Sequence, residues 1–201
     1  MSENKNHLTE KKHILILPRW YPNRHDVQLG NFIRQMAKLV SSAYDVSVIY
    51  VQATDVGDEY EIVENRENNF HEIIVYFKEG QGVFSKIINA RRYKKAQRIA
   101  YNKLDHRPDF CHVHVPYRSA MLATQLRQRD NIPFFITEHW SGHLNGEWQK
   151  KNAADKILYK KILSQSEKIS CVSRKLAEQF KINTGFDAVV IPNLIEIDEA
   201  S

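Results

Sequence analysis

The chain has 201 residues, of which 42% are hydrophobic and 26% are charged, with only 7 Gly and 6 Pro. This composition is ordinary for one soluble globular domain or two small ones, and it excludes disordered and fibrous proteins. The net charge of +5 and the pI near 9.1 favour anionic partners (phosphates, a membrane surface or nucleic acid) without selecting among them.

The N-terminal segment 1–11 is polar and lacks the apolar core of a signal peptide, so we expect it to be disordered. The longest apolar runs are too short to cross a bilayer. Cys111 and Cys171 lie in strand-like segments without a partner at metal-ligand spacing, which predicts two small buried hydrophobic residues in a reducing compartment. We therefore expect a cytoplasmic protein.

Apolar runs alternate with amphipathic segments along the chain. Strands are predicted at 13–18, 46–51, 71–77, 109–115, 133–137, 168–172 and 188–192, with 60–64 as a short strand pairing with 71–77. Helices are predicted at 30–40, 84–104, 117–128, 153–163 and 174–180, the last one capped by Ser173. Strands without polar alternation, separated by helices, indicate a parallel sheet covered on both faces. The fold class is therefore α/β, with one doubly wound, mainly parallel, Rossmann-like sheet.

Two of these helices have a clear apolar face. In the helix 30–40 the inward residues are predicted to be Phe32, Ile33, Met36, Ala37 and Val40. In the helix 153–163 they are predicted to be Ala154, Ile157, Leu158 and Ile162.

Polar and aromatic residues gather where the predicted strands end. Because the carboxyl ends of parallel strands share one edge, and ligands bind in the crevice there, these residues predict a site. They are Trp20 after the first strand; His112, His114, Tyr117 and Arg118; Thr137, Glu138, His139, Trp140 and Ser141; Ser173 and Arg174; and Pro192 and Asn193.

Gly30 opens the first predicted helix. A helix start offers free N–H groups and the positive end of the dipole, which suit a phosphate, and glycine allows close approach. A simple turn glycine explains the same residue. The GxGxxG fingerprint is absent, which argues against an NAD-dependent enzyme.

The histidines raise the question of a metal. His112 and His114 share one face of a strand, and Glu138, His139 and His143 follow nearby in the predicted site. No acidic cluster accompanies them, and neither HExxH nor HxxEH occurs, so motif evidence weighs against a metal centre. Each histidine alone is more typical of a structural residue, and only their grouping indicates function.

The helix 84–104 carries Lys86, Arg91, Arg92, Lys94, Lys95 and Arg98, and positions 91, 94, 95 and 98 share a face. A solvated surface is the simpler interpretation. Attraction to anionic lipid headgroups is the alternative, tested by salt-sensitive liposome binding. No recognised module supports nucleic-acid binding.

Taken in order, these segments resemble the N-terminal domain of family 4 glycosyltransferases, which have the GT-B fold. The first strand and LGNFIRQMAKLV resemble the family's opening strand, glycine loop and first helix. DFCHVHVPYRSAMLA and FFITEHWSGH resemble its D-hHhH strand and its strand-end histidine. ISCVSRKLAEQF and VVIPNLIEID, the most specific pair, resemble the family's VS helix and its h-I-P-N-G-V-D strand.

The chain also departs from the family pattern. Leu29 stands where a second glycine is usual, and Leu194-Ile195-Glu196 replaces Gly-Val-Asp. The second domain, with its Glu-x7-Glu motif, is missing. The resemblance thus implies an acceptor-side domain at 12–193, with 194–201 as the start of a linker to a missing C-terminal, donor-binding domain.

The resemblance implies a retaining, nucleotide-sugar-dependent hexosyltransferase acting on a glycan or lipid-linked acceptor in polysaccharide biosynthesis. It is expected to be inactive as an isolated half, to need no cofactor or metal, and to lie in the cytoplasm or against the inner face of the membrane. His139 is implied as catalytic. Residues implied for the nucleotide sugar are Gly30, Asn31, Ser173 and Asn193. Those implied for substrate binding are His112 and His114, together with an acceptor pocket of Trp20, Tyr117, Arg118, Glu138 and Trp140.

Two alternatives stay open. A catalytically inert sugar- or nucleotide-binding module would have the same sheet and crevice. A metal-dependent hydrolase is the third interpretation, tested by metal content.

Overall fold

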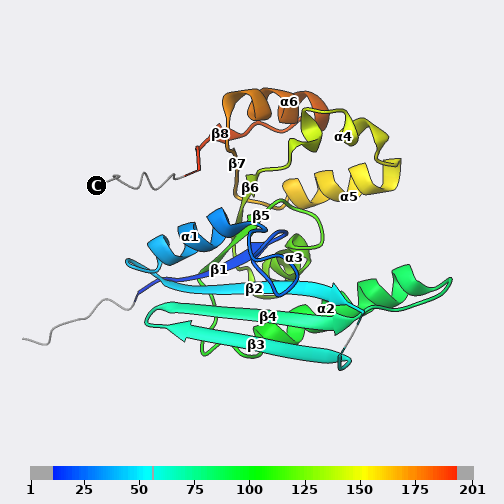
Figure 1. The fold of residues 1–201 in the computed structure, drawn as a ribbon. Coiled ribbons are helices and arrows are strands. Elements are labelled where there is room, and N and C mark those ends of the chain that lie inside the picture. Colours follow the sequence, from blue (N-terminus) through cyan, green and yellow to red (C-terminus); the bar gives the residue numbers. More distant parts are fainter. Residues whose placement is uncertain (1–10, 56, 194–201) are drawn as a thin grey trace, which may run out of the picture.

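The computed structural model describes residues 11–55 and 57–193, so the predicted tail 1–11, except Lys11, and the predicted linker 194–201 lie outside the described residues. It contains an eight-stranded sheet in the order β3-β4-β2-β1-β5-β6-β7-β8 (Figure 1). Every neighbouring pair is parallel except β3 and β4. The predicted fold class is confirmed. The strands are β1 (His13–Pro18), β2 (Asp45–Thr54), β3 (Tyr60–Glu67), β4 (Phe70–Lys78), β5 (Phe110–His114), β6 (Phe134–Glu138), β7 (Lys168–Cys171) and β8 (Val189–Val190).

The helices follow the predicted order, with one addition. The segment between β6 and α5 forms two short helices that the hydrophobic periodicity of the sequence did not predict. Ser173 caps α6 as predicted, since its side chain accepts a hydrogen bond from the Leu176 N–H at 3.2 Å. The helices are α1 (Asn31–Val40), α2 (Ser85–Tyr101), α3 (Ala120–Asp130), η1 (Ser141–His143), α4 (Glu147–Lys150), α5 (Ala153–Leu163) and α6 (Arg174–Thr184).

The predicted short excursion at 60–64 is a full edge strand. β3 pairs antiparallel with β4 from Tyr60 to Glu67. Its outer positions carry charged side chains such as Glu64 and Arg66, which protect an edge strand from pairing with another chain. In the neighbouring strand β4, all residues except Lys78 are buried.

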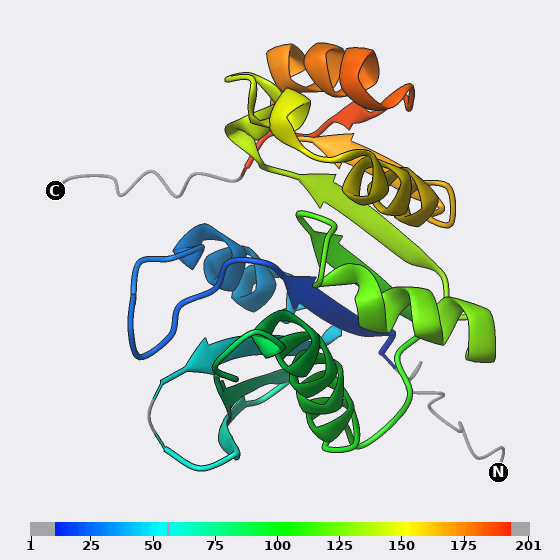
Figure 2. The same cartoon turned by 90° about the vertical axis from the view of Figure 1, so that its right-hand side faces the viewer.

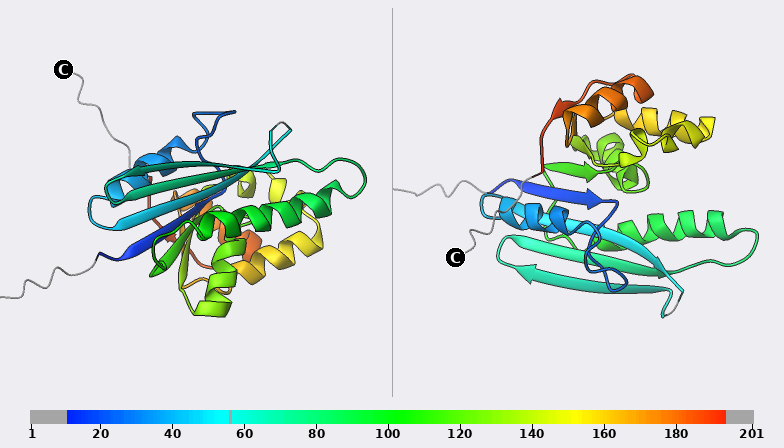
Figure 3. Two further views of the ribbon diagram at one scale, coloured as in Figure 1. Left: turned by 90° about the horizontal axis from the view of Figure 1, so that it is seen from below. Right: turned by 45° about the horizontal axis from the view of Figure 1, so that its top comes forward.

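The two faces of the sheet are covered unequally (Figures 2 and 3). One face packs against buried residues of α2, α3, α4, α5 and α6. The other face has a smaller core, to which only α1 contributes buried helical residues, Ile33 and Ala37, in the described part of the chain. The inward face predicted for α1 is correct. Helices cover both faces as predicted, but unequally, because α2 to α6 all pack against the first face and α1 packs against the second.

The predicted inward face of α5 was correct at Ile162 but wrong at Ala154, Ile157 and Leu158. Ile157 is 68% exposed and Leu158 is 49% exposed, whereas Tyr159, Ile162 and Leu163 are buried. Ile157, Leu158 and Tyr159 are three successive apolar residues, so two faces of similar hydrophobicity were available. The hydroxyl group of Tyr159 decides between them, because it reaches a buried carboxylate in the site.

Cys111 and Cys171 are buried free thiols, as predicted. Over the described ranges, no helix combines the length and the hydrophobicity that a membrane span requires.

Candidate active site

The carboxyl edge of the central strands brings three predicted histidines together. His112 and His114 lie on β5, with ring centroids 4.1 Å apart. His139 directly follows β6, and its Nε2 lies 2.9 Å from Nδ1 of His114, so one of the two nitrogens donates a hydrogen bond to the other. The parallel pairing of β5 with β6 places these two strand ends side by side.

Burial keeps these histidines neutral. It lowers the pKa of His112 to about 4, with the nearby His139 adding to the effect. It also lowers the pKa of His139 to about 4, against a smaller opposing influence of Glu138. The pKa of His114 falls well below its usual value because of burial and its two neighbours. At pH 7 the cluster therefore offers neutral imidazoles, which exchange hydrogen bonds without carrying a charge.

Two nitrogens of this cluster are unusual. Nδ1 of His139 and Nε2 of His114 are buried without a hydrogen-bond partner in the described part of the chain. A buried polar atom without a partner costs free energy, and such atoms call for an explanation in function or strain. The unused Nδ1 gives His139 a free hydrogen-bonding position beside the strand ends.

His112 belongs to a polar chain that runs across the strands. Its Nε2 lies 2.7 Å from Oγ1 of Thr137, which lies 2.8 Å from Oγ of Ser170. Ser170 donates to the carbonyl of Ile136 at 3.3 Å. The chain joins β5, β6 and β7 and fixes the orientation of the His112 ring.

Glu138 is a buried support rather than an exposed contact. Its side chain has no exposed surface, and Oε1 accepts hydrogen bonds from the N–H groups of His139 at 2.9 Å and Trp140 at 2.7 Å. Oε2 accepts from the hydroxyl of Tyr159. Burial and the charge of Glu138 raise the pKa of Tyr159 well above its usual value, so this hydroxyl stays protonated as a donor. Glu138 thus fixes the turn that carries His139 and Trp140.

His143 completes this buried network from η1. Its Nε2 lies 3.3 Å from the hydroxyl of Tyr159, and Asn183 of α6 donates to its Nδ1 and to its carbonyl, both at 3.1 Å. Its ring also packs on Trp148 at 5.0 Å and on Phe180 at 5.1 Å. His143 is a structural residue that joins the segment after β6 to α5 and α6.

We expect Glu138→Gln to lower the free energy of unfolding by about 1–2 kcal/mol. Three hydrogen bonds to a charged acceptor become weaker hydrogen bonds to a neutral amide. Urea unfolding of the purified chain measures this difference. The exposed Glu178, changed to Gln in the same way, should cost no more than about 0.5 kcal/mol. Equal stabilities for the two variants would contradict the supporting role of Glu138.

The start of α1 lies beside the histidine cluster. The Phe32 ring is 5.0 Å from the ring of His139. Gly30, which precedes α1, has a left-handed backbone with φ of 63°. It packs closely on the carbonyl of Trp20. The predicted phosphate site and the predicted catalytic residue are therefore neighbours.

The loop before α1 already uses several of its own N–H groups. Those of Gln28 and Leu29 donate to Oδ1 of Asp26 at 2.9 and 3.0 Å. That of Asn31 donates to the Gln28 carbonyl at 3.2 Å. A ligand at Asn31 would consequently meet its half-buried side-chain amide rather than its backbone.

The predicted aromatic residues form a second group on this edge. Trp20, Tyr117 and Trp140 are half-buried and are linked through two cations, Arg19 and Lys151, that sequence reasoning missed. Neither cation carries a motif, so only the fold reveals them.

Two other predicted residues, Arg118 and Ser173, are exposed. The hydroxyl oxygen of Ser173 already accepts the helix-capping bond, and no contact joins either residue to the histidine cluster in the described part of the chain. The structure does not bring them to His139.

A groove of about 310 Å³ lies on the sheet face that α1 leaves open. Met36 of α1, Phe110 and Phe135 give it an apolar wall, and His112 and His139 lie at its polar side. Asn193, which the resemblance assigned to the nucleotide sugar, lines the same groove as His139.

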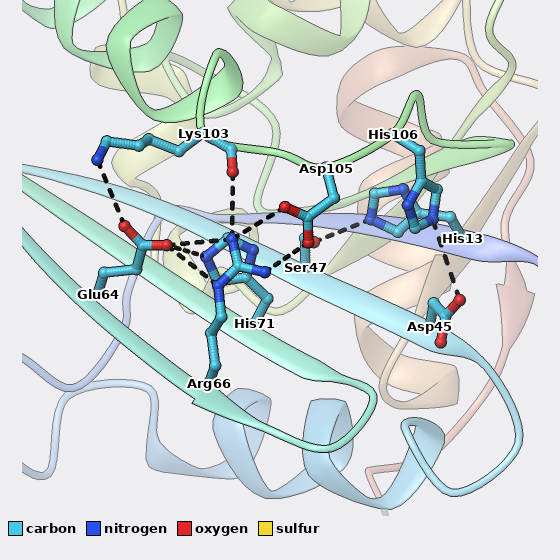
Figure 4. Close-up of polar contacts among 9 residues, drawn as sticks. All are labelled: His13, Asp45, Ser47, Glu64, Arg66, His71, Lys103, Asp105 and His106. Carbon is cyan, nitrogen blue, oxygen red and sulfur yellow. Dashed lines mark hydrogen bonds and ion pairs between the residues drawn. The ribbon is translucent and has the colours of Figure 1, made fainter.

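A separate polar cluster lies at the opposite, amino edge of the sheet (Figure 4). Nε2 of His13 lies 2.9 Å from the Ser47 hydroxyl, and His71 contacts Glu64 at 2.8 Å. Arg66 pairs with both Glu64 and Asp105. These opposite charges join β3, β4 and the loop after α2.

We expect stability to fall as the pH falls from about 6.5 towards 4. The pKa values of five buried or half-buried histidines lie below their unfolded value, chiefly through burial, so the unfolded chain binds more protons in this range. His139 alone, with a pKa of about 4, should contribute about 2 kcal/mol of lost stability between pH 7 and pH 5. The five are His13, His71, His112, His114 and His139.

Urea unfolding at pH 7, 6 and 5 tests this prediction. His139→Asn, which removes one titrating group, should give a shallower dependence on pH. A free energy of unfolding that stays constant over this range would contradict it.

Within residues 11–55 and 57–193, no group of three or more His, Cys, Asp or Glu side chains is arranged to hold a metal ion.

The fold and the site together define an α/β domain of the Rossmann-like type, one half of a GT-B glycosyltransferase fold. The Glycosyltransferase Family 4 model matches residues 29–199. The chain belongs to this family. No curated protein matches it significantly.

Two solved structures are similar to this chain at low sequence identity. LpCGTa in complex with UDP has 11% identity and a TM-score of 0.50, over 94% of this chain and 55% of that one. "Trehalose-6-phosphate from E. coli bound with UDP-2-fluoro glucose" has 12% identity and a TM-score of 0.49, over 87% of this chain and 42% of that one. The chain thus spans about half the length of these structures.

Proposed function

We propose that this chain is the acceptor-side half of a retaining glycosyltransferase that moves a sugar from a nucleotide-sugar donor to a glycan or lipid-linked acceptor in polysaccharide biosynthesis. Membership of the family supports transfer. The observation that carries the proposal is His139, a neutral histidine at a strand end with an unused buried nitrogen, beside the start of α1. The domain at 12–193 would bind the acceptor, and a donor-binding domain would follow the linker at 194–201.

Two features of the site would take part in the proposed chemistry: the His139 side chain and the amino end of α1. Transfer develops an oxocarbenium-like sugar and a departing diphosphate, and both need positioned partners. Nδ1 of His139, which its surroundings enclose in this structure, would exchange a hydrogen bond with a hydroxyl of the transferred sugar or of the acceptor after a local opening of the neighbouring groove. The amino end of α1 would face the diphosphate, where the helix dipole favours negative charge. Gly30, Asn31 and Asn193 would border the donor, and no divalent cation would be required.

His114 and Glu138 would act as positioning residues in this mechanism. His114 holds Nε2 of His139, and Glu138 holds its backbone N–H. Together they fix the ring and the turn, so the remaining nitrogen has a defined direction. His112 would maintain the packing of His114.

The test is a transfer assay with the complete protein and a panel of nucleotide sugars, with a chelator added to half of the reactions. Transfer that is retained with chelator, with the anomeric configuration of the donor preserved in the product, supports the proposal. Binding of a nucleotide sugar without transfer to any acceptor would favour the inert binding module instead. The isolated chain should be inactive, because most donor contacts would lie outside it.

A membrane contact would suit a lipid-linked acceptor. Val83 is 95% exposed, Phe84 is 69% exposed and Ile87 is 54% exposed, and the first turn of α2 projects beyond the strands (Figure 1). The helix also carries the predicted basic residues, of which Lys86 lies in the same turn as this apolar tip. We propose that this tip enters the headgroup region of an anionic membrane.

Sedimentation with liposomes tests this contact. Vesicles that contain anionic lipid should bind the chain at low salt and release most of it at high salt, whereas neutral vesicles should bind weakly. Phe84→Ser should reduce binding, and the exposed Ile182→Ser on α6 serves as its control. Equal binding by both variants would exclude the α2 tip.

A further inference from the structure

A row of alternating cations and rings lies at the carboxyl edge. Arg19 lies 5.5 Å from the Trp20 ring and 5.8 Å from the Tyr117 ring. Lys151 lies 5.2 Å from the same Tyr117 ring and 4.6 Å from that of Trp140. The loops after β1, β5 and β6 and the end of α4 supply these residues. Both positive groups therefore lie within 6 Å of the centre of one tyrosine ring, so they are no more than about 11 Å apart.

These two cations have no acidic partner. Among residues 11–55 and 57–193, neither Arg19 nor Lys151 forms an ion pair, although most charged groups at the amino edge do. The carboxylate beside Tyr117 is Asp155, which accepts from the tyrosine hydroxyl at 3.0 Å and from the Asn152 amide at 3.0 Å. Two neighbouring cations without a counterion attract an anion to the space between them.

The rings hold the cations in place. Trp140 lies against Gly142 so closely that a Cβ on Gly142 would be 2.0 Å from the indole. The indole also packs edge-on against the buried His143 at 5.2 Å. With Lys151 over the same ring, Trp140 is better suited to positioning this ammonium group than to stacking on a sugar. Rings orient a cation without neutralising it.

We propose that Arg19 and Lys151 bind a phosphate group of the acceptor. The guanidinium can meet two phosphate oxygens, and the ammonium provides a point charge. Because Lys151 lies over the ring of Trp140, which directly follows His139, the anion would lie near the candidate catalytic histidine. The phosphate belongs either to a free sugar phosphate or to a lipid-linked diphosphate. This inference rests on the proposed function for the identity of the acceptor.

Calorimetric titration of the chain tests the binding itself. The probes are glucose 1-phosphate, its neutral counterpart methyl glucoside, and geranyl diphosphate, a water-soluble lipid diphosphate. We expect glucose 1-phosphate or geranyl diphosphate to bind and methyl glucoside to bind at least tenfold more weakly. The stronger of the two anionic probes identifies the source of the phosphate. Binding of methyl glucoside as tight as that of the stronger anionic probe, or no binding of either anion, would overturn the assignment.

Matched variants locate the site. Arg19→Gln and Lys151→Gln should each weaken binding of the anionic probe about tenfold, and Lys151→Arg should restore most of the affinity. The exposed neighbour Lys150, changed to Gln, should leave it unchanged. Thermal unfolding confirms that each variant is folded. Anion affinity that is equal in the wild type and both charge-removing variants would place the anion elsewhere.

The transfer assay separates this inference from the proposed function. Efficient transfer by the complete protein to neutral acceptors, unaffected by Lys151→Gln, would refute the phosphate assignment and leave the glycosyltransferase function intact. Anion binding that Lys151→Gln weakens, without transfer from any nucleotide sugar, would retain the anion site and refute the transferase.

Discussion

Replacement of His139 by alanine in the complete protein is expected to lower kcat/KM for sugar transfer at least tenfold. The variant loses Nδ1, the free hydrogen-bonding position at the strand end, and removes the partner of His114. A hydrogen bond made to developing charge in a preorganised site is commonly worth this much or more. Initial rates over a range of donor and acceptor concentrations measure the effect. A lower kcat would indicate that His139 stabilises the transition state.

The control for this variant is His106→Ala. His106 is exposed and lies at the amino edge, against His13 (Figure 4). His139 follows β6 at the opposite, carboxyl edge of the sheet. Its turnover should match the wild type. Because His139 also packs on Phe32, urea unfolding must show that His139→Ala remains folded under the assay conditions. Unchanged turnover in a folded His139→Ala protein would remove this residue from the mechanism.

Hydrophobic pattern alone was enough to predict the sheet. Apolar runs such as HILILP and the buried β4 have no polar alternation, and the intervening helices fixed parallel pairing. The same argument located the site, since parallel strands bring their following residues to one edge. His112, His114 and His139 therefore meet as expected, although nothing in their spacing indicated the direct bond between His114 and His139.

The hydrophobic pattern could not predict the buried contact between Tyr159 and Glu138 that supports the site. The inward position of Tyr159 is evident only from the packing of α5 in the structure, because the periodicity of the sequence favoured Ile157 and Leu158 as inward residues. A hydroxyl in contact with the buried Glu138 carboxylate outweighs that small difference in apolar area, since an unpartnered buried charge is costly. Glu138 itself was predicted as an acceptor contact, and its full burial makes it a positioning residue instead.

Tertiary contacts also explain the missed cations. Arg19 and Lys151 are separated by more than half of the chain, and each has an ordinary local sequence. Only the pairing of β1 with β5, and the short helices after β6, bring both to the Tyr117 ring. The open face beyond α1 has a similar origin, because crossover direction is a property of strand order and not of any one segment.

Gly30 was predicted as a phosphate contact, and the structure adds a steric reason for glycine at this position. Its backbone is left-handed, with φ of 63°. A Cβ there would lie 2.3 Å from the carbonyl oxygen of Trp20 and 2.6 Å from its carbonyl carbon. These are backbone atoms just beyond the end of β1, so no side-chain rotation relieves the contact. The close approach fixes the first helix against the first strand, whether or not a phosphate binds.

We therefore expect Gly30→Ala to lower the free energy of unfolding by about 3–4 kcal/mol, of which about 1–2 kcal/mol is left-handed strain and the rest is displacement of α1 from the Trp20 carbonyl. Gly146→Ala is the matched control, since Gly146 has φ of 84° but no atom within 4 Å of the position that an alanine Cβ would occupy. In that control, backbone strain alone should lower the free energy of unfolding, by about 1 kcal/mol. Urea unfolding of both variants gives the difference. Gly30→Ala could lower the free energy of unfolding by no more than Gly146→Ala does. In that case packing on Trp20 is not the reason for a glycine at position 30, and contact with a phosphate becomes the better explanation.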